Sequence, residues 1–155
     1  MNSLQNLNDV GNDSPEKMEK IARLFLIQKY KEKINIHLKN SYGPDGGCDY
    51  VARIDDQSIS IAVSIQKKVN EKIRKEINNA KKNGFEKLIF CTNQIVKETS
   101  RTNLTNESKA EGVDLIIFDL NEIAELAVNN QEIQEILDIN IEKYKITKEA
   151  IRNGH

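Results

Sequence analysis

Two short, uninterrupted apolar runs, at residues 88–91 and 113–118, constrain the fold of this chain more than any other feature. Continuous apolar runs of this length are typical of strands that are buried on both faces, as in parallel sheets covered by helices on each side. Helical patterns stand at residues 70–83, where Gly84 ends the pattern, and at residues 121–137. Strands that alternate with helices in this way pair in parallel through right-handed crossovers, so the second half of the chain predicts an α/β fold.

The first half of the chain predicts one helix followed by a meander of three strands. Ser14 and Pro15 form a helix start, and the apolar positions continue to about residue 33. Alternation of apolar and polar residues then predicts strands at 34–38, 49–54 and 58–66. Residues 92–105 are polar and predict no clear element, and a further helix is expected at about 106–111. The expected architecture is an α/β fold with a mixed sheet of about five strands, sandwiched by helices in the order αβββαβαβα.

Length and composition indicate one domain with loose ends. The chain has 155 residues, enough to bury a core, and residues 14–138 are expected to form the domain. Residues 1–13 are expected to be a flexible tail, and residues 139–155 a C-terminal helix or a linker to further domains of a longer protein. No apolar run approaches the roughly 18–20 residues of a membrane span, and the polar start does not resemble a secretory signal. The two cysteines, Cys48 and Cys91, fall in or beside expected strands, which predicts free thiols and a cytoplasmic location.

The charge is unevenly distributed, although the formal net charge is only −1. Residues 66–87 hold eight basic and three acidic side chains, a balance of +5, whereas residues 107–142 hold ten acidic side chains and one lysine. A basic segment of this kind predicts contact with phosphates, with the acidic third of the chain facing elsewhere. Solvated helix faces would produce the same pattern, so charge alone leaves both interpretations open.

A glycine-rich segment and a strand end carry the residues that suggest chemistry. Residues 43–49 read GPDGGCD and place Asp49 at the start of an expected strand, while the next strand ends in Gln66, Lys67 and Lys68. On an extended chain Gln66 and Lys68 face the same side, about 7 Å apart, and a hairpin would bring Asp49 beside them. Oxygen ligands hold Mg²⁺, and a nearby cation stabilises charge on a phosphate, as phosphodiester hydrolysis requires.

These motifs resemble the PD-(D/E)xK restriction-endonuclease-like nuclease superfamily, and most closely its Mrr-like branch, in which G-x-D-G-G-x-D precedes a strand carrying Q-x-K or E-x-K. The resemblance covers most of the chain and implies a restriction-endonuclease-like sheet. It implies that Asp49 binds the metal, that Gln66 binds or orients it, and that Lys68 is the catalytic lysine. In the family a glutamate on the first helix often completes the site, and Glu19 fits that pattern best, with Glu16 one turn earlier as the second choice. The amide of Gln66 leaves fewer negative charges for the metal than a carboxylate would.

The resemblance implies a metal-dependent DNA endonuclease that hydrolyses phosphodiester bonds with Mg²⁺, or Mn²⁺ in its place, in restriction or antiviral defence. DNA would be the partner, with its backbone phosphates held by four basic residues, Lys67, Lys72, Arg74 and Lys75. Cutting both strands implies a homodimer or larger assembly, and members of that branch usually carry additional sensor, ATPase or specificity domains; no membrane partner is expected. Two alternatives stay open: a catalytically weak or inactive nuclease-fold module that binds nucleic acid or a partner protein, and an interaction domain that packs through its acidic C-terminal helices.

Overall fold

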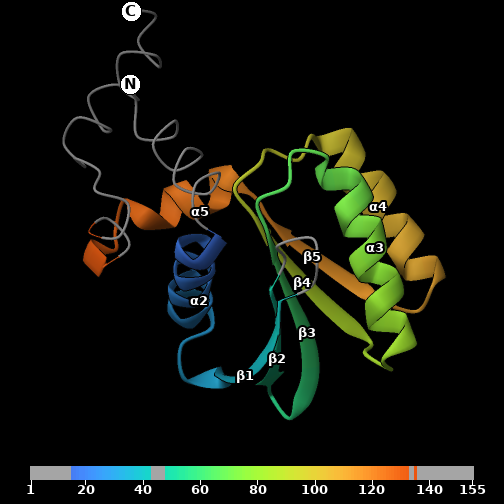
Figure 1. The fold of residues 1–155 in the computed structure, drawn as a ribbon, viewed down its shortest axis with the longest axis horizontal. Helices are drawn as coiled ribbons and strands as arrows, with labels where there is room; N and C mark the ends of the chain where they lie inside the picture. The colour runs from blue at the N-terminus through green and yellow to red at the C-terminus, as the bar shows by residue number, and fades with distance from the viewer. Residues whose placement is uncertain (1–14, 43–47, 133–134, 136–155) are drawn as a thin grey trace, which may run out of the picture.

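The computed structural model describes residues 15–42, 48–132 and 135, which form one sheet flanked by helices (Figure 1). Within residues 37–49 it describes the backbone of the strands alone. Most of the glycine-rich segment, the expected N-terminal tail and the expected C-terminal helix or linker therefore lie outside the described residues.

The sheet is mixed, and its strands stand in the order β1-β2-β3-β4-β5. The first three strands pair antiparallel and the last three pair parallel. The α/β class and the mixed sheet of five strands, which the alternation of strand and helix patterns predicted, are confirmed. The strands are β1 (Ile34–Tyr42), β2 (Cys48–Ile54), β3 (Gln57–Ser64), β4 (Lys87–Thr92) and β5 (Asp114–Phe118).

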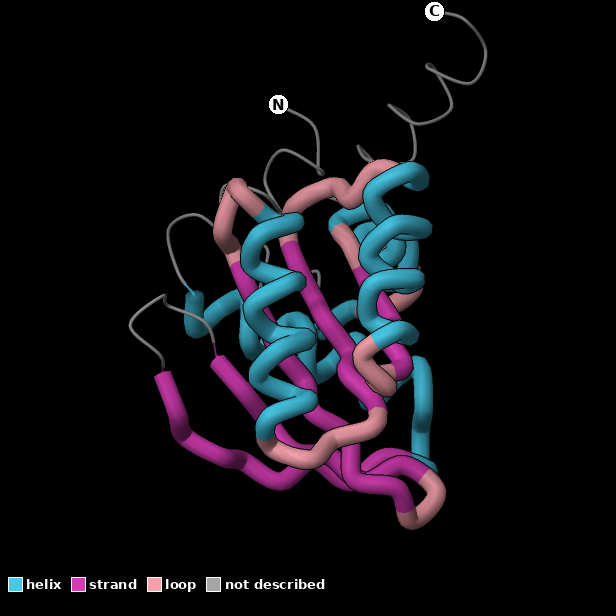
Figure 2. The backbone as a smooth tube through the Cα atoms, turned by 90° about the vertical axis from the view of Figure 1, so that its right-hand side faces the viewer, coloured by secondary structure: helices cyan, strands magenta, loops and turns pink. Residues whose placement is uncertain are grey.

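Helices cover both faces of the sheet. In the described part of the chain these are α2 (Pro15–Tyr30), the 3-10 helix η1 (Lys31–Lys33), α3 (Val69–Lys82), α4 (Glu98–Ala110) and α5 (Leu120–Ala127). Helices α3 and α4 lie on one face and α2 and α5 on the other, and Figure 2 looks onto the face with α3 and α4. None of the described helices is long and apolar enough to cross a membrane.

Each face of the sheet has its own apolar core, because successive residues of a strand point to opposite faces. In β3, Ile61 belongs to the core beneath α2 and α5, while its neighbour Ala62 belongs to the core beneath α3 and α4. In β2, Tyr50 and Ala52 pack into the first of these cores. The period of two therefore assigns the odd-numbered positions of β2 to the face that carries α3 and α4.

Two helices end in the same glycine-based motif. After α3, Gly84 has φ +81°, its N–H donates to the Lys81 carbonyl at 3.1 Å, and the N–H of Phe85 donates to the Ala80 carbonyl at 2.9 Å. This is the Schellman arrangement, which satisfies the last carbonyls of the helix and turns the chain toward the next strand. Gly112, with φ +78°, holds the same place after α4. The prediction that Gly84 ends its helix is confirmed.

Strand β3 is shorter than its sequence pattern predicted. It ends at Ser64 and not at residue 66, because the Ser64 hydroxyl accepts the backbone N–H of Gln66 at 3.1 Å and the chain leaves the sheet there. Gln66 and Lys68 are therefore not on one extended strand, and the spacing expected for them along a strand does not apply.

Two helices also differ from expectation. Helix α4 begins at Glu98, so it fills a polar stretch that predicted no clear element; only Leu104 and Ser108 of this helix are buried, which leaves an apolar stripe too thin to recognise. Helix α5 ends at Ala127, so the helix predicted to reach residue 137 is interrupted, although residues 131, 132 and 135 are again helical. Asn129 and Asn130 follow it, and asparagine is a poor helix former.

Candidate active site

The predicted catalytic residues belong to one edge of the sheet. Strand β2 enters the sheet at this edge, and the backbone register pairs Asp49 with Ala62 near the carboxyl end of β3. Strands β4 and β5 also end here, since Ser64 pairs with Thr92, and Cys91 pairs with Phe118. In open α/β sheets the carboxyl ends of parallel strands are where ligands usually bind. We call this edge the carboxyl edge.

Three neighbouring strands end at the carboxyl edge by the same device, in which a side-chain oxygen accepts the backbone N–H two residues later. Ser64 closes β3 in this way, and the Thr92 hydroxyl closes β4 by accepting the N–H of Gln94 at 3.0 Å. After β5, the Asp119 carboxylate accepts the N–H groups of Asn121 at 3.0 Å and Glu122 at 3.4 Å. Such turns end the hydrogen bonding of the strand at a defined residue, so each following segment begins at a fixed position relative to the sheet.

Asp49 is placed by the backbone register of β2 against β3. Its Cα pairs with that of Ala62, which packs into the core beneath α3 and α4, while Tyr50 packs into the opposite core. The side chain of Asp49 lies outside the described residues. The backbone register brings Asp49 to the strand end that Gln66 and Lys68 follow.

Residues 65–68 form the loop between β3 and α3. Gln66 is half-buried, and Lys67 and Lys68 are exposed. Lys68 occupies the N-cap position of α3, and its carbonyl accepts the backbone N–H of Lys72 at 3.3 Å. The structure thus places an amide and an ammonium group at one junction, with the start of α3 as their support.

Glu19 lies on α2, on the opposite face of the sheet from α3. Helix α2 has 16 residues and leads through η1 into β1, whose first residue, Ile34, pairs with Ile54 at the far edge. A helix of this length spans about 24 Å, close to the roughly 26 Å of the eight residues of β3. Glu16 and Glu19 lie in the first turns of α2, at the end of the helix away from η1, on the other face of the sheet from α3.

The four basic residues expected on DNA separate into two groups. Lys67 and Lys75 are exposed. Arg74 is also exposed but forms an ion pair with Glu107 of α4, with Nε to Oε2 at 2.9 Å, which raises the pKa of the guanidinium.

Lys72 differs from the other three, because its side chain is only 5% exposed. It pairs with Glu76 one turn later, with Nζ to Oε1 at 3.0 Å. A buried, paired ammonium does not present its charge at the surface, so we leave Lys72 out of the proposed DNA-contacting set.

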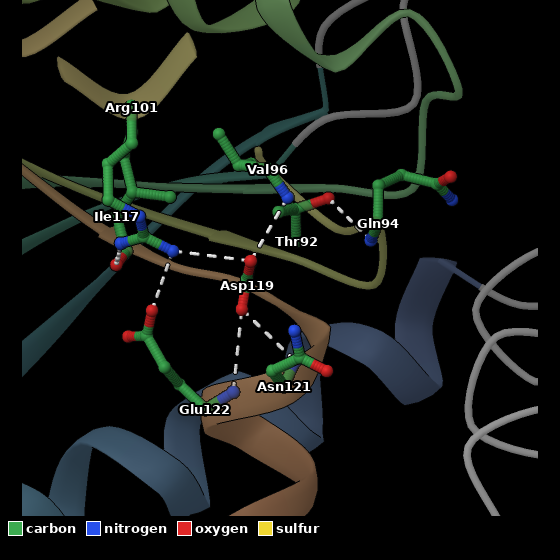
Figure 3. Close-up of polar contacts among 8 residues, drawn as sticks. All are labelled: Thr92, Gln94, Val96, Arg101, Ile117, Asp119, Asn121 and Glu122. Atoms are coloured by element: carbon green, nitrogen blue, oxygen red, sulfur yellow. Dashed lines mark hydrogen bonds and ion pairs between the residues drawn. The ribbon is translucent and has the colours of Figure 1, made fainter. Parts of the chain in front are cut away.

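The sequence interpretation missed a polar network around Asp119 (Figure 3). Besides capping α5, this buried carboxylate accepts the backbone N–H of Val96 at 3.0 Å and pairs with Arg101 Nη2 at 3.2 Å. Arg101 also donates to the Ile117 carbonyl at 2.7 Å and pairs with Glu122 at 2.7 Å. The network joins the β4–α4 loop to the end of β5. An aspartate directly after a buried strand and before a helix was the available signal.

Glu122 titrates abnormally within this network. Burial raises the pKa of its carboxyl group, and this effect outweighs the ion pair with Arg101, which lowers it. Glu122 therefore keeps its proton to a higher pH than an exposed glutamate does.

Two open grooves flank the β4–α4 loop. One has a volume of about 430 Å³, lies between the start of α3 and the loop, and is lined by Lys67, Lys68, Val69, Asn70, Glu71, Ile95, Lys97 and Ser100. We call it the lysine groove. The other has a volume of about 540 Å³ and is lined by residues that include the Asp119 network. The lysine groove adjoins the β3–α3 loop, and Lys97 and Ile95 are two of its residues that the sequence did not single out.

The carboxyl edge offers oxygen donors of the kind that bind Mg²⁺. Within the described residues there is no group of three or more histidine, cysteine, aspartate or glutamate side chains close enough to hold a metal. Asp49, whose register brings it to this edge, would add a carboxylate, and Gln66 an amide oxygen. Both are hard oxygen donors of the kind that Mg²⁺ takes, and Mg²⁺ commonly keeps several waters and binds through one or two protein groups. The chemistry of the set fits such an ion.

No protein-family model matches this chain, and no curated protein matches it significantly.

Proposed function

We propose that this chain is a metal-dependent DNA endonuclease domain of the PD-(D/E)xK type, closest to the Mrr-like branch, acting in restriction or antiviral defence. One observation carries the proposal: the β2–β3 register sets Asp49 beside the end of the strand that leads into Gln66 and Lys68. The order of elements along the chain and the mixed sheet between two helix layers support a restriction-endonuclease-like fold.

Asp49 and Gln66 would hold the metal, and Glu19 would approach it from α2. A bound Mg²⁺ ion, or Mn²⁺ in its place, supplies Lewis acidity toward the phosphoryl oxygens. Lys68 is exposed at the junction with α3, so its ammonium group can reach a phosphate and stabilise the negative charge that develops on it. Hydrolysis adds water across one P–O bond, so one product end keeps the phosphate and the other gains a hydroxyl group.

A nicking assay with supercoiled plasmid and Mg²⁺ or Mn²⁺ tests the proposal. Asp49→Asn and Lys68→Gln should each abolish metal-dependent nicking, because each removes a charge on which the chemistry depends. Asp55→Asn is the control for the first, since Asp55 is an exposed turn residue at the other end of β2 whose φ of +50° asparagine tolerates. Lys82→Gln is the control for the second, at the last residue of α3.

The outcome is decisive in both directions. Nicking that the two controls retain and the two site variants lose supports the assignment. Nicking that survives Asp49→Asn, or wild-type protein that never cuts in either metal, rejects it.

A DNA-binding module that does not cut is the second candidate. Gln66 favours it, because an amide holds a divalent cation less firmly than a carboxylate does. Retained DNA binding without any nicking by the wild type would select this alternative.

A homodimer is part of the leading proposal, because a duplex break needs a cut in each strand. Light scattering in the presence of DNA should then report two copies per duplex. If one copy binds the duplex and the protein only nicks it, the homodimer is ruled out, while hydrolysis of a single strand still stands.

A further inference from the structure

We infer that the lysine groove holds a stretch of DNA backbone beside the proposed cleavage site, with Lys97 on a phosphate and Ile95 against a sugar or base. This inference rests on the proposed function, because it states where the substrate strand runs. Its residues come from the start of α3 and from the β4–α4 loop. Lys97 and Ile95 lie outside the motif that suggested a nuclease.

The groove concentrates positive charge that no described partner neutralises. Lys67, Lys68 and Lys97 line it, all three are exposed, and none forms an ion pair with another described residue. Among the described residues of the lining, Glu71 is the one acidic side chain. Three ammonium groups around one depression repel each other, and a polyanion is the ligand that relieves this repulsion.

Two cations farther from the groove on the same helix pair are neutralised. Farther along α3, Arg74 pairs with Glu107 of α4, and Lys81 pairs with Glu111, the residue that follows α4. In the lysine groove, by contrast, three exposed lysines from two separate segments line one depression.

The walls of the groove are held in place before any ligand binds. Asn70 Nδ2 of α3 donates to Ser100 Oγ of α4 at 3.2 Å. Val96 is buried, with 4% of its surface exposed, and its N–H is held by Asp119, as Figure 3 shows. Its two neighbours, Ile95 and Lys97, project from this anchored point. Preorganised contacts of this kind bind at a lower entropic cost than mobile ones.

Ile95 adds an apolar contact next to the charges. It is 56% exposed, on a loop that is anchored at the next residue. It lines both grooves at the β4–α4 loop. Cations beside an apolar side chain suit a nucleic-acid strand, because its phosphates are charged and its sugars and bases are not.

The order of the strands places the groove along a path that passes the proposed active site. Asp49 stands on β2, Lys68 follows β3 and Lys97 follows β4, and these strands are neighbours in that order. A DNA strand laid along the carboxyl edge would therefore meet the proposed metal site first and Lys97 next.

Binding of a fluorescein-labelled DNA duplex, measured by anisotropy over a series of salt concentrations in Ca²⁺ or without metal, tests the inference. Lys97→Ala should weaken binding about threefold or more and reduce the slope of log K against log salt by about 0.9, the value for one lost phosphate contact on duplex DNA. Lys109→Ala is the matched control, because Lys109 is exposed in the last turn of the same helix that Lys97 caps. Ile95→Ser should weaken binding without changing the slope, because it removes no charge.

The results separate this inference from the nuclease proposal. If Lys97→Ala binds with the affinity and slope of Lys109→Ala, the groove does not hold DNA, even if the wild type cuts plasmid. If Lys97→Ala alone lowers the slope and the wild type never cuts, the groove assignment stands and the cleavage proposal fails. An Ile95→Ser protein that binds like the wild type would remove Ile95 from the contact surface and leave Lys97 in it.

Discussion

Replacing Asp119 by alanine tests the network that anchors the β4–α4 loop. The carboxylate caps α5, and removing a helix cap costs about 1 kcal/mol. It also accepts the N–H of Val96, a residue with 4% of its surface exposed, and an orphaned buried N–H costs about 1–3 kcal/mol. Arg101 loses one partner but keeps Glu122 and the Ile117 carbonyl, so its share is small. We expect a total loss of about 3 kcal/mol of unfolding free energy.

Urea unfolding followed by far-ultraviolet circular dichroism measures this loss. Asp119→Asn retains one acceptor oxygen and should lose roughly half as much, because an amide cannot accept all four of the bonds that the carboxylate accepts. Asp114→Ala is the control; it lies at the exposed start of the same strand and should change stability by no more than about 0.5 kcal/mol.

The reasoning fails if Asp119→Ala lies within about 1 kcal/mol of the wild type while the slope of the denaturant dependence is unchanged. That result would mean that water replaces the carboxylate as the acceptor of the Val96 N–H without loss of unfolding free energy. A large loss of unfolding free energy in Asp114→Ala would also contradict the reasoning, because the stability would then come from the strand and not from the network.

Four further predictions concern single side chains. Gly84→Ala should destabilise the protein by about 1 kcal/mol in urea unfolding, because φ is +81° there while no atom would contact the added methyl group. Cys91 should be unreactive toward a thiol reagent in the folded state of a Cys48→Ser variant, because burial raises the pKa of its thiol; labelling without denaturant would contradict this. The pKa of Glu122 is raised in the folded protein, so its contribution to stability is present below the ordinary pKa of 4.5 and is lost as the pH rises through the folded pKa. Glu122→Gln should therefore flatten this part of the pH–stability curve, and an unchanged curve would refute the assignment. Gln66→Glu should lower the Mg²⁺ concentration needed for half-maximal nicking, and a higher requirement would argue against Gln66 as a metal ligand.

Most of the sheet could be predicted from sequence because burial of a strand requires a simple pattern of apolar residues. The apolar run at residues 88–91 and the alternation at residues 59–65 reflect which faces are covered, and both became strands in the structure. Gly84 could be assigned as a helix end because few other residues adopt its backbone conformation easily. These signals are local, so one sequence contains them.

The parts that could not be predicted depend on contacts across the chain. Whether β3 continued to Gln66 depended on the Ser64 hydroxyl taking the N–H of Gln66, which a periodic pattern does not record. Lys72 looked like its exposed neighbours, yet its position on α3 turns it inward against Glu76. The lysine groove forms only when α3 and the β4–α4 loop come together, so Lys97 carried no signal of its own.

The paired ends of β3 and β4 bear on how this scaffold can be altered. Ser64 and Thr92 pair with each other, and the hydroxyl of each stops its strand by accepting the backbone N–H of the residue two positions later. The side chains of the two loops take no part in these turns. We expect residue 67 and residue 95 to tolerate exchange with little effect on folding, so that libraries built at these two positions would vary what the edge binds while the frame beneath stays constant.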